Sequence, residues 1–134
     1  MTEPCVFCQI IRHEAPSSTV FEDQTTIAFL SNSPVNLGHT LIVPKKHYET
    51  IHQINDEEIA HLYIVVKQVA EAVNKAIKPE GIRIVQNNGE AAGQVIPHFH
   101  VHVIPMYRQL SVFHGEIREP NALEKDAENI RSFI

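Results

Sequence analysis

The stretch Pro97-His98-Phe99-His100-Val101-His102-Val103-Ile104-Pro105 carries a histidine at every second position between two prolines. The residues that separate the histidines are apolar and favour β-strands. Because successive side chains of a strand point to opposite faces, we expect the three histidines on one face and the apolar side chains on the other. The prolines suit strand ends, where a missing N–H does not interrupt the ladder. Any polar residue would serve on a plain surface strand, so three histidines in register indicate phosphate chemistry or metal binding.

Length and charge limit the classes of function. The chain has 134 residues, 43% of them hydrophobic, which is enough for one core, so we expect residues 1–134 to form a single domain. The net charge is −5 and no basic run is present, which disfavours a binder of nucleic acid polymers. A nucleotide can still be held by backbone N–H groups and a few polar side chains.

Neither a membrane span nor a signal peptide is expected. No apolar run reaches the length that crosses a bilayer, and Met1-Thr2-Glu3-Pro4 lacks the basic and apolar regions of a leader. These features predict a cytoplasmic protein. In a reducing compartment, Cys5 and Cys8 are not expected to form a structural disulfide.

The rest of the sequence predicts an antiparallel sheet covered by a long helix. Asn55 is a suitable N-cap for a helix over 56–77, whose apolar residues follow three-four spacing. A second helix is expected near 122–133 with Asn121 at its cap, and an irregular segment over 107–115. The other expected elements are a helical turn over 6–12 and strands over 19–22, 26–30, 39–43 and 81–86. Strands joined by hairpins with one covering helix make an α+β domain.

The spacing of the histidines suits an extended substrate. Neighbours two apart on a strand are roughly 7 Å apart. A histidine whose second nitrogen is held by a backbone carbonyl presents a neutral, nucleophilic nitrogen at pH 7, and its neighbours can stabilise charge on phosphoryl oxygens. Backbone N–H groups of Gly93-Gln94 would lie beside the strand, as in many anion sites.

These residues resemble a known family. His98-Phe99-His100-Val101-His102-Val103-Ile104 is similar to the His-x-His-x-His-x-x signature of the histidine triad (HIT) superfamily, in which x is apolar. Other segments stand at the family's spacing, over roughly residues 4 to 108: Phe7-Cys8-Gln9-Ile10-Ile11, Gly38-His39-Thr40-Leu41-Ile42-Val43-Pro44-Lys45-Lys46-His47, and Asn87-Asn88-Gly89 with Gly93-Gln94. The N-terminal Cys-x-x-Cys resembles bacterial members. The implied fold is a HIT-like antiparallel sheet with one long helix packed on it and a C-terminal helix.

The resemblance implies a nucleotide hydrolase or transferase that acts on an α-phosphate. His100 would be the nucleophile and would form a covalent nucleotidyl-histidine that water resolves. His102 would contact the phosphoryl oxygens, while His98 and His39 would complete the histidine cluster.

The resemblance also implies a set of substrate-binding residues. Asn87 with Gly93 and Gln94 match positions that hold ribose and phosphate, and Phe7 with Ile10 match apolar positions that line the base pocket. Two positions depart from the family pattern. Val95 stands where many members carry a serine or threonine near the leaving group, and Ser31 stands where the family has a ribose-binding acid. Val95 offers no proton, and a hydroxyl binds a ribose more weakly than a carboxylate does.

Cys5-Val6-Phe7-Cys8 is the second motif with chemical meaning. Alone, it is ambiguous between metal binding and redox use. With His47 and His98 it makes a Cys2His2 set that suits tetrahedral zinc, and some HIT proteins resemble this arrangement and bind zinc. We expect a structural zinc there. The alternative is a pair of buried thiols that act as small apolar residues.

Several other charged, histidine and aromatic residues are not assigned to catalysis or metal binding. We interpret Lys45-Lys46 as a solvated strand end, and Tyr107 with Arg108 as residues at the mouth of the site. The surface histidines without an identifiable partner are His13, His52, His61 and His114.

The expected function is hydrolysis of a nucleoside phosphoramidate, a dinucleoside polyphosphate or a related nucleotide conjugate, by a homodimer, which is the usual state of the family. An alternative is a nucleotide-binding regulatory protein whose catalysis is vestigial because of Val95 and Ser31. A third interpretation, a zinc hydrolase with all three triad histidines on one ion, is disfavoured because neighbours two apart on a strand rarely converge on one metal.

Overall fold

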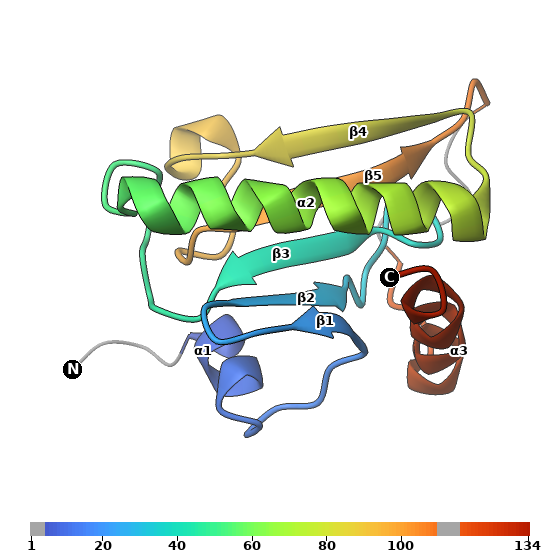
Figure 1. The fold of residues 1–134 in the computed structure, drawn as a ribbon, viewed down its shortest axis with the longest axis horizontal. Coiled ribbons are helices and arrows are strands. Elements are labelled where there is room, and N and C mark those ends of the chain that lie inside the picture. The colour runs from blue at the N-terminus through green and yellow to red at the C-terminus, as the bar shows by residue number, and fades with distance from the viewer. Residues whose placement is uncertain (1–4, 110–115) are drawn as a thin grey trace.

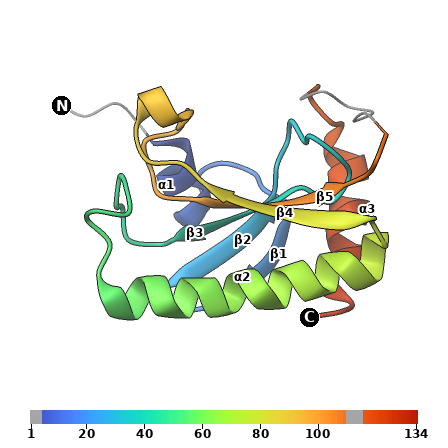
Figure 2. The same ribbon diagram turned by 90° about the horizontal axis from the view of Figure 1, so that it is seen from above.

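The computed structural model describes residues 5–109 and 116–134. In chain order the elements are α1 (Val6–Ile11), β1 (Thr19–Glu22), β2 (Thr26–Leu30), β3 (Thr40–Pro44), α2 (Asp56–Ile77), β4 (Gly81–Gln86), the 3-10 helix η1 (Glu90–Ala92), β5 (Val101–Met106) and α3 (Pro120–Arg131). The strands pair antiparallel in the order β1-β2-β3-β5-β4. Helix α2 runs along one face of the sheet and α1 lies on the other (Figures 1 and 2). The predicted α+β class is confirmed.

Helix α2 begins and ends where the sequence signals predict. The Oδ1 of Asn55 accepts a hydrogen bond from the N–H of Glu58 at 2.9 Å, and three acidic residues occupy the first turn, near the positive end of the helix dipole. The helix ends at Ile77, and its C-cap, Lys78, is in the left-handed conformation (φ 55°) immediately before Pro79. The helix thus presents one apolar stripe along its full length.

That stripe forms the main core with the sheet. Leu62, Val66 and Val69 are almost fully buried against the apolar residues of β5, Val101 and Val103. Helix α3 joins the same core through Leu123, Ala127 and Ile130, and packs on α2 and β1. Each fully buried aliphatic side chain contributes about 1.5–3 kcal/mol, so this face supplies much of the stability.

The histidine-bearing strand is shorter than predicted. We expected a strand from Pro97 to Pro105, but β5 begins at Val101, because β3 and β4 pair with it only from that residue onward. Before it, the N–H of Phe99 bonds to the carbonyl of Tyr48 in a neighbouring loop at 2.7 Å. The alternation of faces continues through this segment although the ladder does not.

Two other element ends differ from prediction. Helix α3 begins at Pro120 and is capped by Glu119, whose carboxylate accepts from the N–H of Ala122 at 3.1 Å; Asn121 is inside the helix. Proline is preorganised for a first turn, and this overrides the asparagine signal. The third strand begins at Thr40, because the N–H of His39 bonds to Asn36 in a turn.

The loop before β3 packs closely on the end of α2. Gly38 has a φ of +92°, and a Cβ there would lie 2.9 Å from Cγ1 of Ile77. Only glycine meets both conditions without strain. The loop therefore packs in one fixed position against the last turn of α2.

None of the helices in residues 5–109 and 116–134 is long and apolar enough to cross a membrane. The predictions for Met1 to Pro4, for His114 and for the part of the irregular segment beyond residue 109 lie outside the described residues.

Candidate functional site

The three histidines share the face of the sheet opposite α2. Phe99, Val101 and Val103 are fully buried in the core beneath α2, so the alternating histidines point away from it. His98 and His100 are buried and His102 is half-buried. The rings of His100 and His102 have centroids 4.9 Å apart. The predicted division of faces is confirmed, and it places a histidine row on the side of the sheet that carries α1.

His100 has one nitrogen fixed by the backbone. Its Nδ1 lies 2.7 Å from the carbonyl oxygen of His98. A carbonyl only accepts, so Nδ1 carries the proton and Nε2 keeps its lone pair. Burial lowers the pKa of His100 below its usual value, against the opposing effect of this hydrogen bond. The ring is neutral at pH 7 and has a free basic nitrogen.

A chain of three groups fixes the proton on His102. The N–H of Val35 donates to Nδ1 of His39 at 3.1 Å, so His39 carries its proton on Nε2. That Nε2–H faces Nδ1 of His102 at 2.9 Å, which leaves the proton of His102 on its own Nε2. Burial, with the neighbouring histidines, lowers the pKa of His39 to about 3 and that of His102 to about 4. The neutral His102 thus offers an N–H donor.

Apolar residues cover the β2 and β3 side of the row. Phe7 packs edge-on against His100 with ring centroids 5.2 Å apart, and against His98 at 5.8 Å. Phe7 and Ile10, the two predicted base-pocket residues, are buried in a second cluster. The cluster's other buried members, all from β2 and β3, are Ile27, Phe29, Leu41 and Val43. The structure therefore brings both predicted residues to the histidine face.

Ser31 lies at the end of β2 beside the histidine cluster. Its N–H donates to the carbonyl of His39 at 2.9 Å, and its Oγ accepts from the N–H of Ser33 at 3.3 Å. The side chain is buried. The residue predicted at the ribose position is thus adjacent to His39, and its hydroxyl hydrogen remains available for another acceptor.

The loop between β4 and β5 brings Asn87 and Gly93 together. Gly93 has a φ of +94°, and a Cβ there would lie 3.7 Å from Nδ2 of Asn87. The Gln94 side chain is already occupied: Oε1 accepts from Gly89 N–H at 2.7 Å, and Nε2 donates to the carbonyls of Glu49 and Ile96. Gln94 therefore shapes the loop in this structure, while the side chain of Asn87 has no hydrogen bond to the described residues.

Cys5, Cys8, His47 and His98 form a compact ligand set. One donor atom from each lies within 4.8 Å of all the others. Nδ1 of His98 is 3.4 Å from Sγ of Cys5 and 3.6 Å from Sγ of Cys8, and Nδ1 of His47 is 3.3 Å from Sγ of Cys8. Adjacent ligands in tetrahedral zinc sites are roughly 3.5 Å apart, given bonds of about 2.0–2.3 Å. These donors fit a zinc ion.

The protonation states of His98 and Cys8 determine how these residues can bind a metal. Nε2 of His98 lies 2.8 Å from the carbonyl oxygen of Pro44, so it carries the proton and Nδ1 is free to bind a metal. Burial, with the hydrogen bond and charge of Cys5, raises the pKa of Cys8 to about 11. A metal must therefore displace a proton from this thiol, and affinity will rise with pH.

Several interactions were not predicted. Nε2 of His61 lies 2.7 Å from Oδ2 of Asp23, so His61 does have a partner. Lys45 pairs with Glu22 at 2.7 Å, and Arg108 with Glu80 at 3.2 Å. These partners are far apart in sequence, and single-residue patterns give no signal for them. The N–H of Val35 was missed for another reason: a backbone donor leaves no signal in the side-chain sequence.

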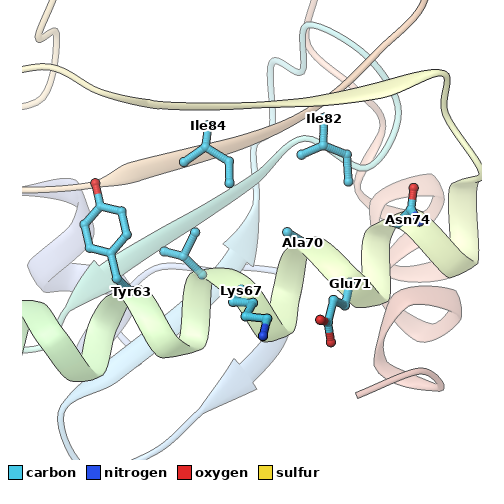
Figure 3. A pocket seen from close by; sticks show the side chains of 8 residues that line it. Tyr63, Lys67, Ala70, Glu71, Asn74, Ile82 and Ile84 are labelled. Carbon is cyan, nitrogen blue, oxygen red and sulfur yellow. The ribbon is translucent and has the colours of Figure 1, made fainter.

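A hollow of about 410 Å³ lies on the other face of the sheet, away from the histidines, between α2 and β4 (Figure 3). Its apolar wall includes Ile82 and Ile84, which point toward α2, and Tyr63 on the helix. Tyr63 and Ile84 are exposed. This groove borders β4, one of the two edge strands of the sheet, and plays no part in the histidine site.

The chain is similar to known proteins over most of its length. The profile of the HIT domain matches residues 12–109. An adenosine 5'-monophosphoramidase of Schizosaccharomyces pombe is 39% identical over 75% of this chain and 73% of its own. An adenylylsulfatase of Arabidopsis thaliana is 36% identical over 92% of this chain and 63% of its own. A crystal structure of a zinc-bound histidine triad family protein from Mycobacterium smegmatis matches with a TM-score of 0.84 and 31% identity, covering 96% of this chain and 91% of that one.

The matched segment contains the histidine row and the Asn87 loop. The zinc-bound neighbour covers nearly the whole chain. The fold, the histidine row and these similarities agree: the chain belongs to the HIT domain family.

Proposed function

We propose that this protein hydrolyses nucleotide conjugates at the α-phosphate through a covalent intermediate on His100. The observation that carries the proposal is the bond between Nδ1 of His100 and the carbonyl of His98, which leaves Nε2 as a buried, neutral nucleophile. The relatives named as a phosphoramidase and an adenylylsulfatase both suggest substrates of this class. The substrates we propose are nucleoside phosphoramidates, dinucleoside polyphosphates and related conjugates.

In the first step, Nε2 of His100 attacks the α-phosphorus, a P–N bond forms and the bond from phosphorus to the leaving group breaks. Nε2–H of His102 donates to a non-bridging oxygen and stabilises its growing charge, and His39 keeps His102 in that tautomer. In the second step, water attacks phosphorus and loses a proton to solvent, the P–N bond breaks with its electron pair returning to Nε2 of His100, and the nucleoside monophosphate leaves.

We propose that the nucleoside lies over β2 and β3. Phe7 and Ile10 would contact the base, Ser31 the ribose, and Asn87 with the Gly93 backbone the phosphate. Gln94 would contribute through the shape of the loop. His98 would act as a positioning residue, since its carbonyl holds His100.

We further propose that Cys5, Cys8, His47 and His98 hold a structural zinc ion. Four protein ligands complete a tetrahedral site, so no position would remain for catalytic water. The site would join the α1 turn, the segment after β3 and the start of the histidine row. The zinc-bound neighbour supports this assignment.

We propose a homodimer that uses the groove between α2 and β4. An edge strand with unpaired backbone groups and exposed Tyr63 and Ile84 is suited to pair with a second copy. Residues 1–134 would form a single domain in each copy, because α3 shares the core of α2.

A substrate panel tests the function. Purified protein is given adenosine 5'-phosphoramidate, adenylyl sulfate and diadenosine polyphosphates, and the reaction is quenched in denaturant for peptide mass spectrometry. We expect turnover and a nucleotidylated peptide that contains His100. Tight binding of AMP with no turnover of the whole panel would favour the regulatory alternative.

A further inference from the structure

Arg83 differs from the other arginines of the chain. Four of the five arginines pair with a carboxylate, as Arg12 does with Glu14, Arg108 with Glu80, Arg118 with Asp126 and Arg131 with Glu124. Arg83 is exposed and makes no hydrogen bond or ion pair with the residues in ranges 5–109 and 116–134. Within the described residues its guanidinium has no partner, so it can bind an anion on the histidine face.

The position of Arg83 places it on the histidine face. Its neighbours Ile82 and Ile84 point toward α2, so Arg83 and Val85 lie on the opposite face (Figure 3). Val85 pairs with His102, and Arg83 pairs with Ile104 on the same strand. Arg83 is therefore a diagonal cross-strand neighbour of His102, with a backbone separation of roughly 7–8 Å. The long side chain can extend across this distance.

The side of β5 on which Arg83 lies matters for the chemistry. The apolar cluster of Phe7, Ile10, Phe29 and Leu41 covers β2 and β3, which are on one side of β5, and β4 is on the other side. If the nucleoside occupies the apolar side, as the proposed function requires, the β4 side remains for the leaving group. Arg83 then faces the part of the substrate that departs.

Val95, which the resemblance to the HIT family places near the leaving group, gives a second reason to expect an anionic leaving group. Its side chain is 85% exposed and has no proton to donate. An amine leaving group needs a proton as its bond to phosphorus breaks, whereas a sulfate or phosphate leaves as a stable anion. A chain that lacks a donor at this position, and that carries an arginine without a partner among residues 5–109 and 116–134 on the histidine face, is better suited to the second class.

We propose that Arg83 binds a tetrahedral oxyanion, sulfate or phosphate, on the leaving-group side of the α-phosphorus. The inference rests on the proposed function and narrows its substrate class. As Nε2 of His100 forms its bond to phosphorus, the P–O bond to the leaving group breaks, and its electron pair stays on the departing sulfate or phosphate oxygen. The planar guanidinium donates two hydrogen bonds to such a group and stabilises that charge.

The test compares leaving groups across matched variants. We would measure kcat/KM for adenosine 5'-phosphoramidate, adenylyl sulfate and a diadenosine polyphosphate in the wild type, Arg83→Gln, Arg83→Lys and Lys125→Gln. Lys125 is exposed on α3, so its variant has the same charge change away from the site. We expect Arg83→Gln to lower kcat/KM roughly ten- to hundredfold for the two anionic leaving groups and less than about twofold for the phosphoramidate. Arg83→Lys should recover part of the loss, and Lys125→Gln should change nothing.

A binding measurement separates this inference from the proposed function. In a His100→Ala background, calorimetry gives the affinity of intact adenylyl sulfate relative to AMP, with and without Arg83→Gln. We expect Arg83→Gln to abolish the preference for the sulfate, even if the wild type turns over none of the panel. An equal loss for all substrates, or an unchanged affinity ratio, would overturn the role of Arg83. A selective loss for the polyphosphate alone would identify phosphate as the anion.

Discussion

The two faces of the sheet use alternate residues of the same chain segment for opposite purposes. On the α2 side, Phe99, Val101 and Val103 are fully buried among aliphatic side chains, where only shape and volume matter. On the other side, His98, His100 and His102 are held by backbone carbonyls and by His39, where the position of each proton matters. The first face should therefore control stability and the second should control chemistry, and mutations can test this separation.

Loss of the nucleophile should have the largest effect. We expect His100→Ala to lower turnover by several orders of magnitude, about 10⁴-fold or more, while AMP binding and the unfolding midpoint change little. Steady-state kinetics and calorimetry measure both quantities, and His52→Ala, an exposed histidine, is the control. Near-normal turnover in His100→Ala would show that the mechanism is wrong.

Loss of the zinc ligands should lower both the stability of the protein and its turnover. Cys5→Ser with Cys8→Ser should abolish binding of about one zinc per chain and lower the free energy of unfolding by about 4 kcal/mol or more, with a smaller loss of turnover per folded molecule. Metal analysis and thermal unfolding provide the readouts. Wild-type protein treated with a chelator is the matched sample. Native thiols that react freely with thiol reagents, in fully active protein, would contradict a zinc site.

A core truncation under α2 should affect stability alone. Leu62 is fully buried, and Leu62→Ala should cost about 2–5 kcal/mol of unfolding free energy without a change in kcat per folded molecule. Ile64, 58% exposed on the same helix, offers the control Ile64→Ala, which should cost less than about 1 kcal/mol. A large drop in kcat of folded Leu62→Ala would mean that the two faces are coupled through the sheet.

How much of this could be predicted from sequence also differs between the faces. The stripe of α2 and the alternation of residues 98–104 follow from apolar spacing, and both are confirmed. The metal ligands were inferred by resemblance, and the structure brings them together. The proton arrangement was not predicted, because it depends on the N–H of Val35 in a loop and on a carbonyl that belongs to another histidine. Backbone groups leave no pattern in side-chain sequence.

Lowering the pH should destabilise the protein through the histidine face, because the core that the described residues form under α2 contains no group that titrates in this range. The pKa of His39 is lowered to about 3 and that of His102 to about 4, while both are near 6.5 in an unfolded chain. Between pH 4 and pH 6.5 the unfolded state therefore binds more protons than the folded state does. The free energy of unfolding should fall as the pH drops from about 6.5 toward 4, by an amount on the order of a few kcal/mol. Chemical unfolding across this range measures the slope.

The His39→Asn variant tests the source of this pH dependence. It should reduce the slope of unfolding free energy against pH, whatever its effect on the absolute stability. His52→Asn should leave the slope unchanged, since His52 is exposed. Identical slopes in His39→Asn and the wild type would show that the buried histidines are not the source of the acid sensitivity.

The smallest effect is expected at Val95. Val95→Ser restores a hydroxyl, so it should speed substrates with basic amine leaving groups by roughly tenfold or less, and polyphosphates hardly at all. Relative kcat/KM for the two classes is the measurement. An equal gain for both, or no gain for either, would count against a missing proton donor as the reason for the difference.

The close packing of Gly38 on Ile77 has a consequence for how this site can evolve. The loop that ends at Gly38 carries Val35, whose N–H sets the direction of the hydrogen-bonded chain through His39 to His102. A methyl group at position 38 would lie 2.9 Å from Cγ1 of Ile77 and strain the backbone, so we expect the loop to shift and the Val35 N–H to lose its fixed position. The tautomers of His39 and His102 thus depend on a residue that has no side chain, and mutations at the end of α2 can change them without replacing a histidine.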